Sequence, residues 1–240
     1  MGPPKWKKSD VIVLTGSTWR QETKNPKTIL LVAFYSNKDR LMSQHQDGYK
    51  EVASKLKGYA KICVVNCDEQ PDLCKQQSAK IGATTIKLYP YRAHDKPIAF
   101  RSSRPTTKGL YNFVAKNIPS FVKVLVTARD ASSFAETNKN NVKIILVSTK
   151  DKVSVLYKSL SKDFRKQFNF AQITQHNTRA LKALNKAGLE VKTDGKLPAV
   201  FVYIPSMQTT RRYPGRLTHD ELHKYLNTLA RKLARFKSEL

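Results

Sequence analysis

Two long apolar runs, one in each half of the chain, dominate the pattern of hydrophobic and polar positions. Residues 29–35 and 142–147 are almost wholly apolar, and a run of this length is typical of a central strand buried on both faces. A short polar loop follows each run, and apolar residues then return at helical spacing. The pattern therefore predicts a strand, a loop and a helix in each half.

Shorter segments of the same two kinds fill the rest of each half. The pattern predicts strands at 11–14, 60–68, 84–89 and 98–100, with helices from Pro71 and over 107–117; then strands at 122–126, 168–173 and 199–203, with helices at 153–167, 178–189 and after Thr218. This alternation predicts an α/β fold in which each half has a mixed central sheet flanked by helices. The segment 117–120 is the best boundary, so the expected domains are 1–119 and 120–240.

The composition is that of a globular protein in every respect except its charge. Lys and Arg number 44 against 18 Asp and Glu, which gives a formal net charge of +26. Because both halves share this excess, it indicates a whole surface adapted to acidic surroundings or partners. No run approaches the roughly 18 apolar residues of a membrane span, so we expect none. The start has no apolar signal-peptide core, so the protein is expected either to be cytosolic or to lack its leader in the sequence shown.

Three aromatic residues around the first apolar run carry a resemblance to a known family. Phe34 and Tyr35 end the strand, and Tyr49 lies in the following helix. Their register is similar to that of the protein disulfide isomerase family, in which a Phe-Tyr-Ala-Pro-Trp-Cys-Gly-His-Cys-Lys motif follows the strand of a thioredoxin-like domain. The resemblance implies two tandem thioredoxin-like domains, the first of the a type and the second of the redox-silent b type.

The same register indicates that the redox dithiol of the family is absent. The two family cysteines fall on Asp39 and Met42, the family Trp falls on Lys38, and the cis-proline position is Thr84. Disulfide exchange requires a thiolate and a second, resolving thiol, which a carboxylate and a thioether cannot replace. The resemblance therefore implies a redox-inactive member of the family.

The altered loop is the candidate binding surface, because active relatives present the dithiol and the cis-proline to substrate there. Its residues are Tyr35, Lys38, Asp39, Met42 and Thr84. An equally weighted alternative is that the loop only closes a structural domain, since a shared fold does not fix function.

The resemblance also bears on the cysteines and on one proline. Cys67 and Cys74 stand where several family members carry a structural disulfide, which would imply an oxidising compartment; two unconnected thiols are the alternative. Cys63 lies within an apolar strand and is interpreted as a core residue. Pro198 stands at the family's cis-proline position in the second half, so the Leu197–Pro198 bond is a candidate cis bond.

Other motifs add no chemistry. His219 and His223 lie four residues apart, but the order of residues is not that of a zinc protease and no further ligand is evident. Thr218 and Glu221 have the spacing of a helix capping box instead. The basic clusters at 211–213 and 231–237 are interpreted as solvated helix faces. We therefore expect no metal and no cofactor, and the sequence favours a binding protein over an enzyme.

The last four residues, Lys-Ser-Glu-Leu at 237–240, resemble the Lys-Asp-Glu-Leu retrieval signal of the endoplasmic reticulum. The leading hypothesis is a redox-inactive, disulfide-isomerase-like chaperone or protein-binding module in the lumen of that compartment. Its partners would be unfolded or acidic clients, or an acidic chaperone.

A second hypothesis is a basic structural subunit of a large assembly, such as a ribonucleoprotein, that binds nucleic acid. The third and weakest is a residual oxidoreductase that uses Cys63.

Overall fold

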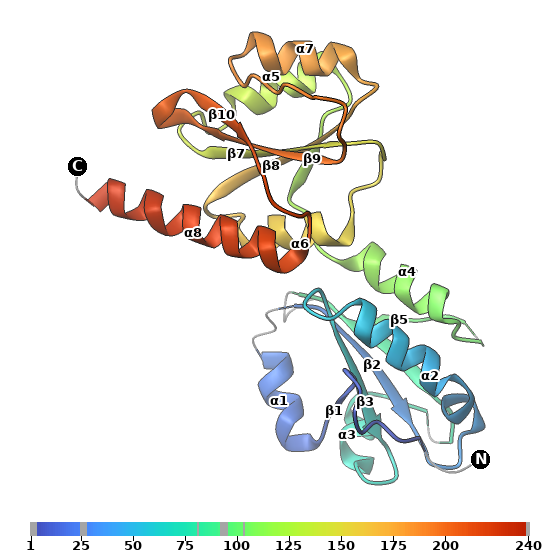
Figure 1. Ribbon diagram of the computed structural model, residues 1–240. Coiled ribbons are helices and arrows are strands. Elements are labelled where there is room, and N and C mark those ends of the chain that lie inside the picture. Colours follow the sequence, from blue (N-terminus) through green and yellow to red (C-terminus); the bar gives the residue numbers. More distant parts are fainter. Residues whose placement is uncertain (1–3, 25–27, 81, 92–95, 103, 239–240) are drawn as a thin grey trace. The chain divides into compact units, whose positions relative to one another are not determined.

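The computed structural model describes residues 4–24, 28–80, 82–91, 96–102 and 104–238, with side chains as far as residue 235. It divides into two compact units, Met1–Ile118 and Pro119–Leu240. Each unit contains one five-stranded sheet with helices packed against it (Figure 1). The predicted α/β class, with two mixed sheets flanked by helices, is confirmed. The retrieval-like ending includes Glu239 and Leu240, which lie outside the described residues.

The first unit alternates strands and short helices. In chain order its elements are β1 (Ile12–Val13), α1 (Gly16–Lys24), β2 (Leu30–Tyr35), α2 (Arg40–Lys55), β3 (Lys61–Asn66), α3 (Pro71–Gln76), β4 (Thr85–Tyr89), β5 (Ile98–Ala99) and α4 (Thr107–Asn117). The sheet order is β1-β3-β2-β4-β5, in which β1, β3 and β2 are parallel while β4 and β5 are antiparallel to their neighbours.

The strand β2 lies in the middle of the sheet, and all six of its residues are buried. Its alternate residues Leu30, Val32 and Phe34 face one core cluster, which also contains Trp19. Since β2 and β3 are parallel and Tyr35 lies opposite Asn66, the two strands end together. The loops after β2 and β3 therefore meet at the same edge of the sheet.

The second unit has the same number of strands in the same order of neighbours. Its elements are β6 (Val122–Val124), α5 (Ala128–Glu136), β7 (Val142–Ser148), α6 (Val155–Asp163), β8 (Phe168–Thr174), α7 (Thr178–Lys186), β9 (Ala199–Ile204), the 3-10 turn η1 (Pro205–Met207), β10 (Thr209–Arg212) and α8 (His219–Ser238). The sheet order is β10-β9-β7-β8-β6. The interpretation of residues 211–213 as a helix face is wrong, because Arg211 and Arg212 lie on β10.

The second sheet is covered on both faces. Alternate residues of β7 divide between two cores: Ile145 and Val147 pack with α5 and α7, while Ile144 and Leu146 pack with α6 and α8 (Figure 1). This division follows from the two-residue repeat of a strand. Among the described residues, no helix has the length and apolar character needed to cross a membrane.

Candidate functional site

The loop after β2 is fixed by the side chain of Asp39. This residue is the N-cap of α2, and its Oδ1 atom accepts a hydrogen bond from the backbone N–H of Leu41 at 2.9 Å. Its Oδ2 atom accepts a hydrogen bond from the hydroxyl of Thr84, immediately before β4. The structure therefore joins two of the residues that the sequence placed at the candidate surface. One carboxylate caps a helix and bridges the loop to the neighbouring strand.

A second carboxylate holds the start of the same loop. Asp68, just after β3, accepts hydrogen bonds from the hydroxyl of Ser36 at 3.0 Å and from the backbone N–H of Asn37 at 2.8 Å. Asn66 accepts a hydrogen bond from the backbone N–H of Asp68 at 3.1 Å, which orients that turn. The loop is held at both ends, because Asp68 accepts from its first residues and its last residue, Asp39, accepts from Leu41 and Thr84.

The candidate surface is only partly open to solvent. Tyr35 and Met42 are 4% and 2% exposed, whereas Lys38 is exposed and Asp39 and Thr84 are half-buried. The indole N–H of Trp6 donates to the Tyr35 hydroxyl at 3.1 Å, and burial raises the pKa of that hydroxyl. A partner that approaches the loop would therefore meet Lys38 and the Asp39–Thr84 pair. The sequence pattern gives no signal for Trp6, which stands alone among lysines.

The three cysteines have different environments. Cys67 and Cys74 form a disulfide with an S–S distance of 2.08 Å and a Cα–Cα distance of 5.7 Å. Cys63 is a free, fully buried thiol on β3, and burial raises its pKa to about 12. At neutral pH this thiol is protonated and shielded from solvent, so it is a poor nucleophile.

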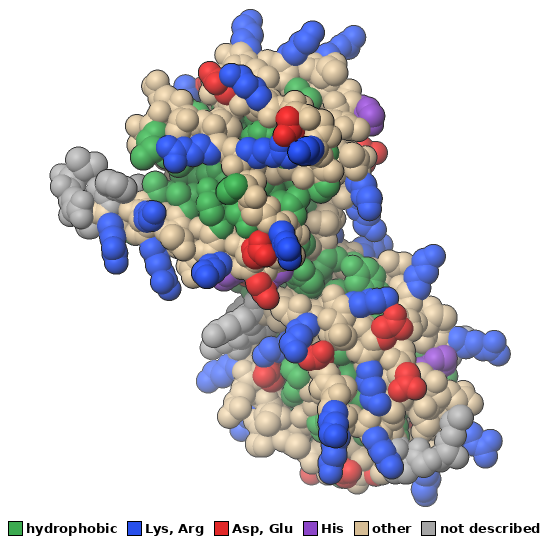
Figure 2. All heavy atoms as spheres, viewed as in Figure 1, with side chains coloured by type: hydrophobic (Ala, Val, Ile, Leu, Met, Phe, Trp, Pro, Cys, Tyr) green, Lys and Arg blue, Asp and Glu red, His purple; other side chains and the backbone are tan. Residues whose placement is uncertain are grey.

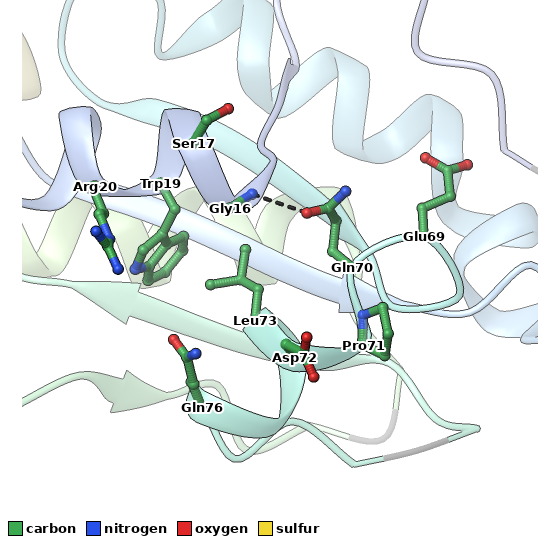
Figure 3. A pocket seen from close by; sticks show the side chains of 10 residues that line it. All are labelled: Gly16, Ser17, Trp19, Arg20, Glu69, Gln70, Pro71, Asp72, Leu73 and Gln76. Atoms are coloured by element: carbon green, nitrogen blue, oxygen red, sulfur yellow. Dashed lines mark hydrogen bonds between the residues drawn. The ribbon is translucent and has the colours of Figure 1, made fainter.

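A polar pocket of about 430 Å³ lies between α1 and α3 (Figure 3). The backbone N–H of Gly16 donates to the side chain of Gln70 at 2.9 Å, at the edge of this pocket. Arg20 lines it together with Glu69 and Asp72. This lining has both signs of charge, and the described residues contain no group of three His, Cys, Asp or Glu side chains that could hold a metal ion there.

The corresponding loop of the second unit, after β7, is also closed by hydrogen bonds. The Ser148 hydroxyl accepts from the backbone N–H of Lys150 at 3.0 Å, and the Gln172 amide donates to the carbonyls of Lys150 and Asp151 at 2.9 and 3.0 Å. The Leu197–Pro198 peptide bond is cis, and Pro198 is exposed. Because the sequence has no cysteine after Cys74, this loop carries no thiol.

The histidines at the start of α8 have structural neighbours. The His219 and His223 rings are 5.5 Å apart, His219 contacts Asp220 at 3.2 Å, and His223 packs on Phe164. The carboxylate of Glu221 accepts from the backbone N–H of Arg216 at 2.9 Å, so it ties the loop before α8 to the helix. The described residues contain no group of three side chains suited to hold a metal ion.

Comparison with known proteins shows similarity along most of the chain. No family model matches it. A putative protein disulfide-isomerase of Dictyostelium discoideum is 28% identical over 93% of this chain and 53% of its own length. A mitochondrial thioredoxin domain-containing protein of Schizosaccharomyces pombe is 32% identical over 65% of this chain and 44% of its own length. The chain thus spans about half the length of these two curated relatives.

The architecture is also similar to a solved structure. The crystal structure of ERdj5, form I, superposes with a TM-score of 0.57 and 15% identity, over 93% of this chain and 30% of that one. At this identity the likeness concerns the fold. Two tandem thioredoxin-like domains therefore make up this chain, and its sequence is similar to those of disulfide-isomerase-like and thioredoxin domain-containing proteins.

Proposed function

We propose that this protein is a disulfide-isomerase-like binding module that holds polypeptide clients without exchanging disulfides with them. The observation that carries this proposal is the Asp39 carboxylate, which caps α2 and accepts the Thr84 hydroxyl at the edge where the family resemblance places a dithiol and a cis-proline. A side chain engaged in these two bonds stabilises the local fold, and it offers no sulfur to a client.

The remaining sulfur chemistry supports the same proposal. Exchange needs a thiolate that can reach a disulfide sulfur. The Cys63 thiol is fully buried and its pKa is raised to about 12 by that burial. Cys74 is only 5% exposed, which limits the access of an attacking thiolate to its bond with Cys67. We therefore assign the Cys67–Cys74 disulfide a structural role.

Clients would be recognised by charge at the loop. Lys38 is exposed there, and the whole chain carries a formal charge of +26. Complementary charge raises association rates and selects partners. The favoured partners are therefore acidic or unfolded polypeptides, or an acidic chaperone that docks at the same edge.

We place this activity in the lumen of the endoplasmic reticulum. A disulfide between Cys67 and Cys74 is consistent with an oxidising compartment, and a relative with similarity along nearly the whole chain is called a protein disulfide-isomerase. Another relative is named as a mitochondrial protein. Cell fractionation followed by thiol labelling distinguishes the two: free Cys67 and Cys74 in the native protein would contradict the lumenal assignment.

The test of client binding uses a charge reversal at the loop with a matched control. Chemically denatured rhodanese is diluted into buffer with the full chain, and its aggregation is followed by light scattering. We expect Lys38→Glu to weaken the suppression of aggregation, whereas Lys108→Glu, an equal charge change at an exposed residue of α4, leaves it unchanged. Equal effects of the two variants, or no suppression by the wild-type chain, would overturn the proposal.

A further inference from the structure

The last part of α8 has an apolar face that the second sheet covers only in part. Leu222 and Leu226 are 1% and 0% exposed. Beyond Leu226, none of the residues 227–235 is fully buried. Leu229 and Leu233, which lie one helical turn apart, are partly buried against the same core. The apolar stripe thus continues, with one leucine in each turn, past the part of α8 that the sheet buries.

These side chains line a groove between α8 and the β9–β10 hairpin. The groove has a volume of about 800 Å³. Its apolar lining comprises Ile204, Met207, Tyr225, Leu229 and Leu233, and Met207 on the turn between the strands is 56% exposed. Figure 2 shows hydrophobic side chains gathered over the strip between β10 and α8, with Lys and Arg side chains on both sides of it.

The charged part of the lining has one sign. Arg211, Lys232 and Arg235 line the groove, and the described lining residues include no carboxylate. Arg211 and Lys232 are exposed, and within the described residues neither forms an ion pair. The next residue of β10, Arg212, points to the other face of the strand and pairs with Asp194. Arg211 and Lys232 are therefore available to a ligand.

We propose that this groove binds an acidic amphipathic helix of a partner protein. A helix that lays its apolar face in a groove uses side chains spaced by one turn, which matches the spacing of Leu229 and Leu233. Carboxylates at the edges of such a helix would reach Arg211 and Lys232. The site lies in the second unit, so the inference goes beyond the client contact assigned to the β2–α2 loop.

Charge and surface type select this occupant. A second copy of the chain would bring another +26 charges to a cationic groove, which disfavours self-association. A single-stranded nucleic acid would use aromatic side chains on which successive bases stack, but four of the five apolar lining residues are aliphatic, and Tyr225 is the aromatic one. Aliphatic side chains flanked by cations fit an acidic protein segment better.

The test measures fluorescence anisotropy of a labelled model helix with the full chain. The probe peptide has Leu on one helical face and Glu on the other; its controls are a scrambled peptide of the same composition and an oligouridine. We expect the double variant Arg211→Glu, Lys232→Glu to weaken binding of the probe about tenfold by charge reversal. The control is the double variant Lys182→Glu, Lys186→Glu, which makes an equal charge change at exposed residues of α7. It should weaken binding of the probe less than about twofold.

A second variant separates apolar contact from charge. Met207→Glu changes an exposed residue, so it should fold normally and also weaken binding of the probe. The loop variant Lys38→Glu should leave binding of the probe unchanged. This result would distinguish the groove from the proposed client site at the β2–α2 loop. Equal losses in the two double variants, equal binding of the scrambled peptide, or binding of oligouridine in place of the probe would overturn the proposal.

Discussion

At the scale of single residues, the hydrogen bonds of Asp39 fix the loop after β2 in the first unit. The family register predicts from the sequence that Asp39 and Thr84 stand at the dithiol and cis-proline positions. It does not predict that they bond to each other, because the contact joins residues far apart in the chain and depends on how β4 lies beside α2. The helix cap of Asp39 follows from its residue type at a helix start, whereas the bond to Thr84 required the structure.

Replacement of Asp39 by Ala should destabilise the first unit. The variant loses the N-cap of α2 and leaves the Thr84 hydroxyl without its acceptor, so we expect the free energy of unfolding to fall by about 1–2 kcal/mol. Thr84→Val removes the second bond alone and should cost less. Urea denaturation measures both. A Thr84→Val loss as large as that of Asp39→Ala would show that the cap contributes little.

The buried thiol of Cys63 should make stability depend on alkaline pH. Its pKa is raised by burial from 9.0 to about 12, so the folded state keeps a proton that the unfolded state loses. The stabilising contribution is therefore present below about pH 9 and is lost as the pH rises towards 12. Between about pH 8.5 and about pH 9.5 the free energy of unfolding should fall by about 0.7 kcal/mol from this group. The free energy of unfolding of Cys63→Ala, measured in urea, should fall less steeply with pH over this range than that of the wild type. An equally steep fall would contradict the burial argument.

At the scale of elements, prediction succeeded where apolar runs were long and failed where elements were short and polar. The central strands β2 and β7 are buried along their whole length, and both were predicted. The helix α5 was not predicted, although Thr127 and Asp130 form a capping box at its start. The strand β10, Thr-Thr-Arg-Arg, has no hydrophobic alternation; its pairing with β9 through the η1 turn determines its structure.

Removal of the disulfide should weaken the β3–α3 region. The cross-link closes a short loop between β3 and a six-residue helix, and the chain-entropy estimate for such a loop is about 2–3 kcal/mol. The double variant Cys67→Ala, Cys74→Ala should therefore lower the free energy of unfolding by that amount in urea. Wild-type protein unfolded in the presence of a reductant serves as the control, and the two losses should agree. A loss well below 1 kcal/mol would argue against a structural role.

The uncovered end of α8 should be the least protected part of that helix. Backbone hydrogen bonds that few buried apolar contacts support open readily. We expect amide hydrogens after Leu226 to exchange faster than those around Leu222 and Leu226, which are buried. Hydrogen–deuterium exchange with mass spectrometry measures this difference. Uniform protection along residues 219–235 would show that the helix is fully supported without a partner.

At the scale of the whole molecule, the chain forms two compact units, each with its own sheet and buried core. The second unit has a core on each face of its sheet. The α/β architecture was predictable because strand and helix periodicity alternates along the chain, and the family register indicated the tandem thioredoxin-like arrangement. The groove beside α8 was not predictable. It depends on where the sheet ends relative to the helix, and on a strand that the pattern does not reveal.

The central claim is that this protein binds polypeptides without exchanging disulfides, and its most direct test is turnover in an insulin-reduction assay. The full chain is compared with an active disulfide isomerase as a positive control. We expect the rate to equal the background of the reductant alone, and to be the same for Cys63→Ala and for Cys67→Ala, Cys74→Ala. Turnover above background that disappears in either variant would contradict the account, because it would show that a buried or bonded sulfur reacts with a client.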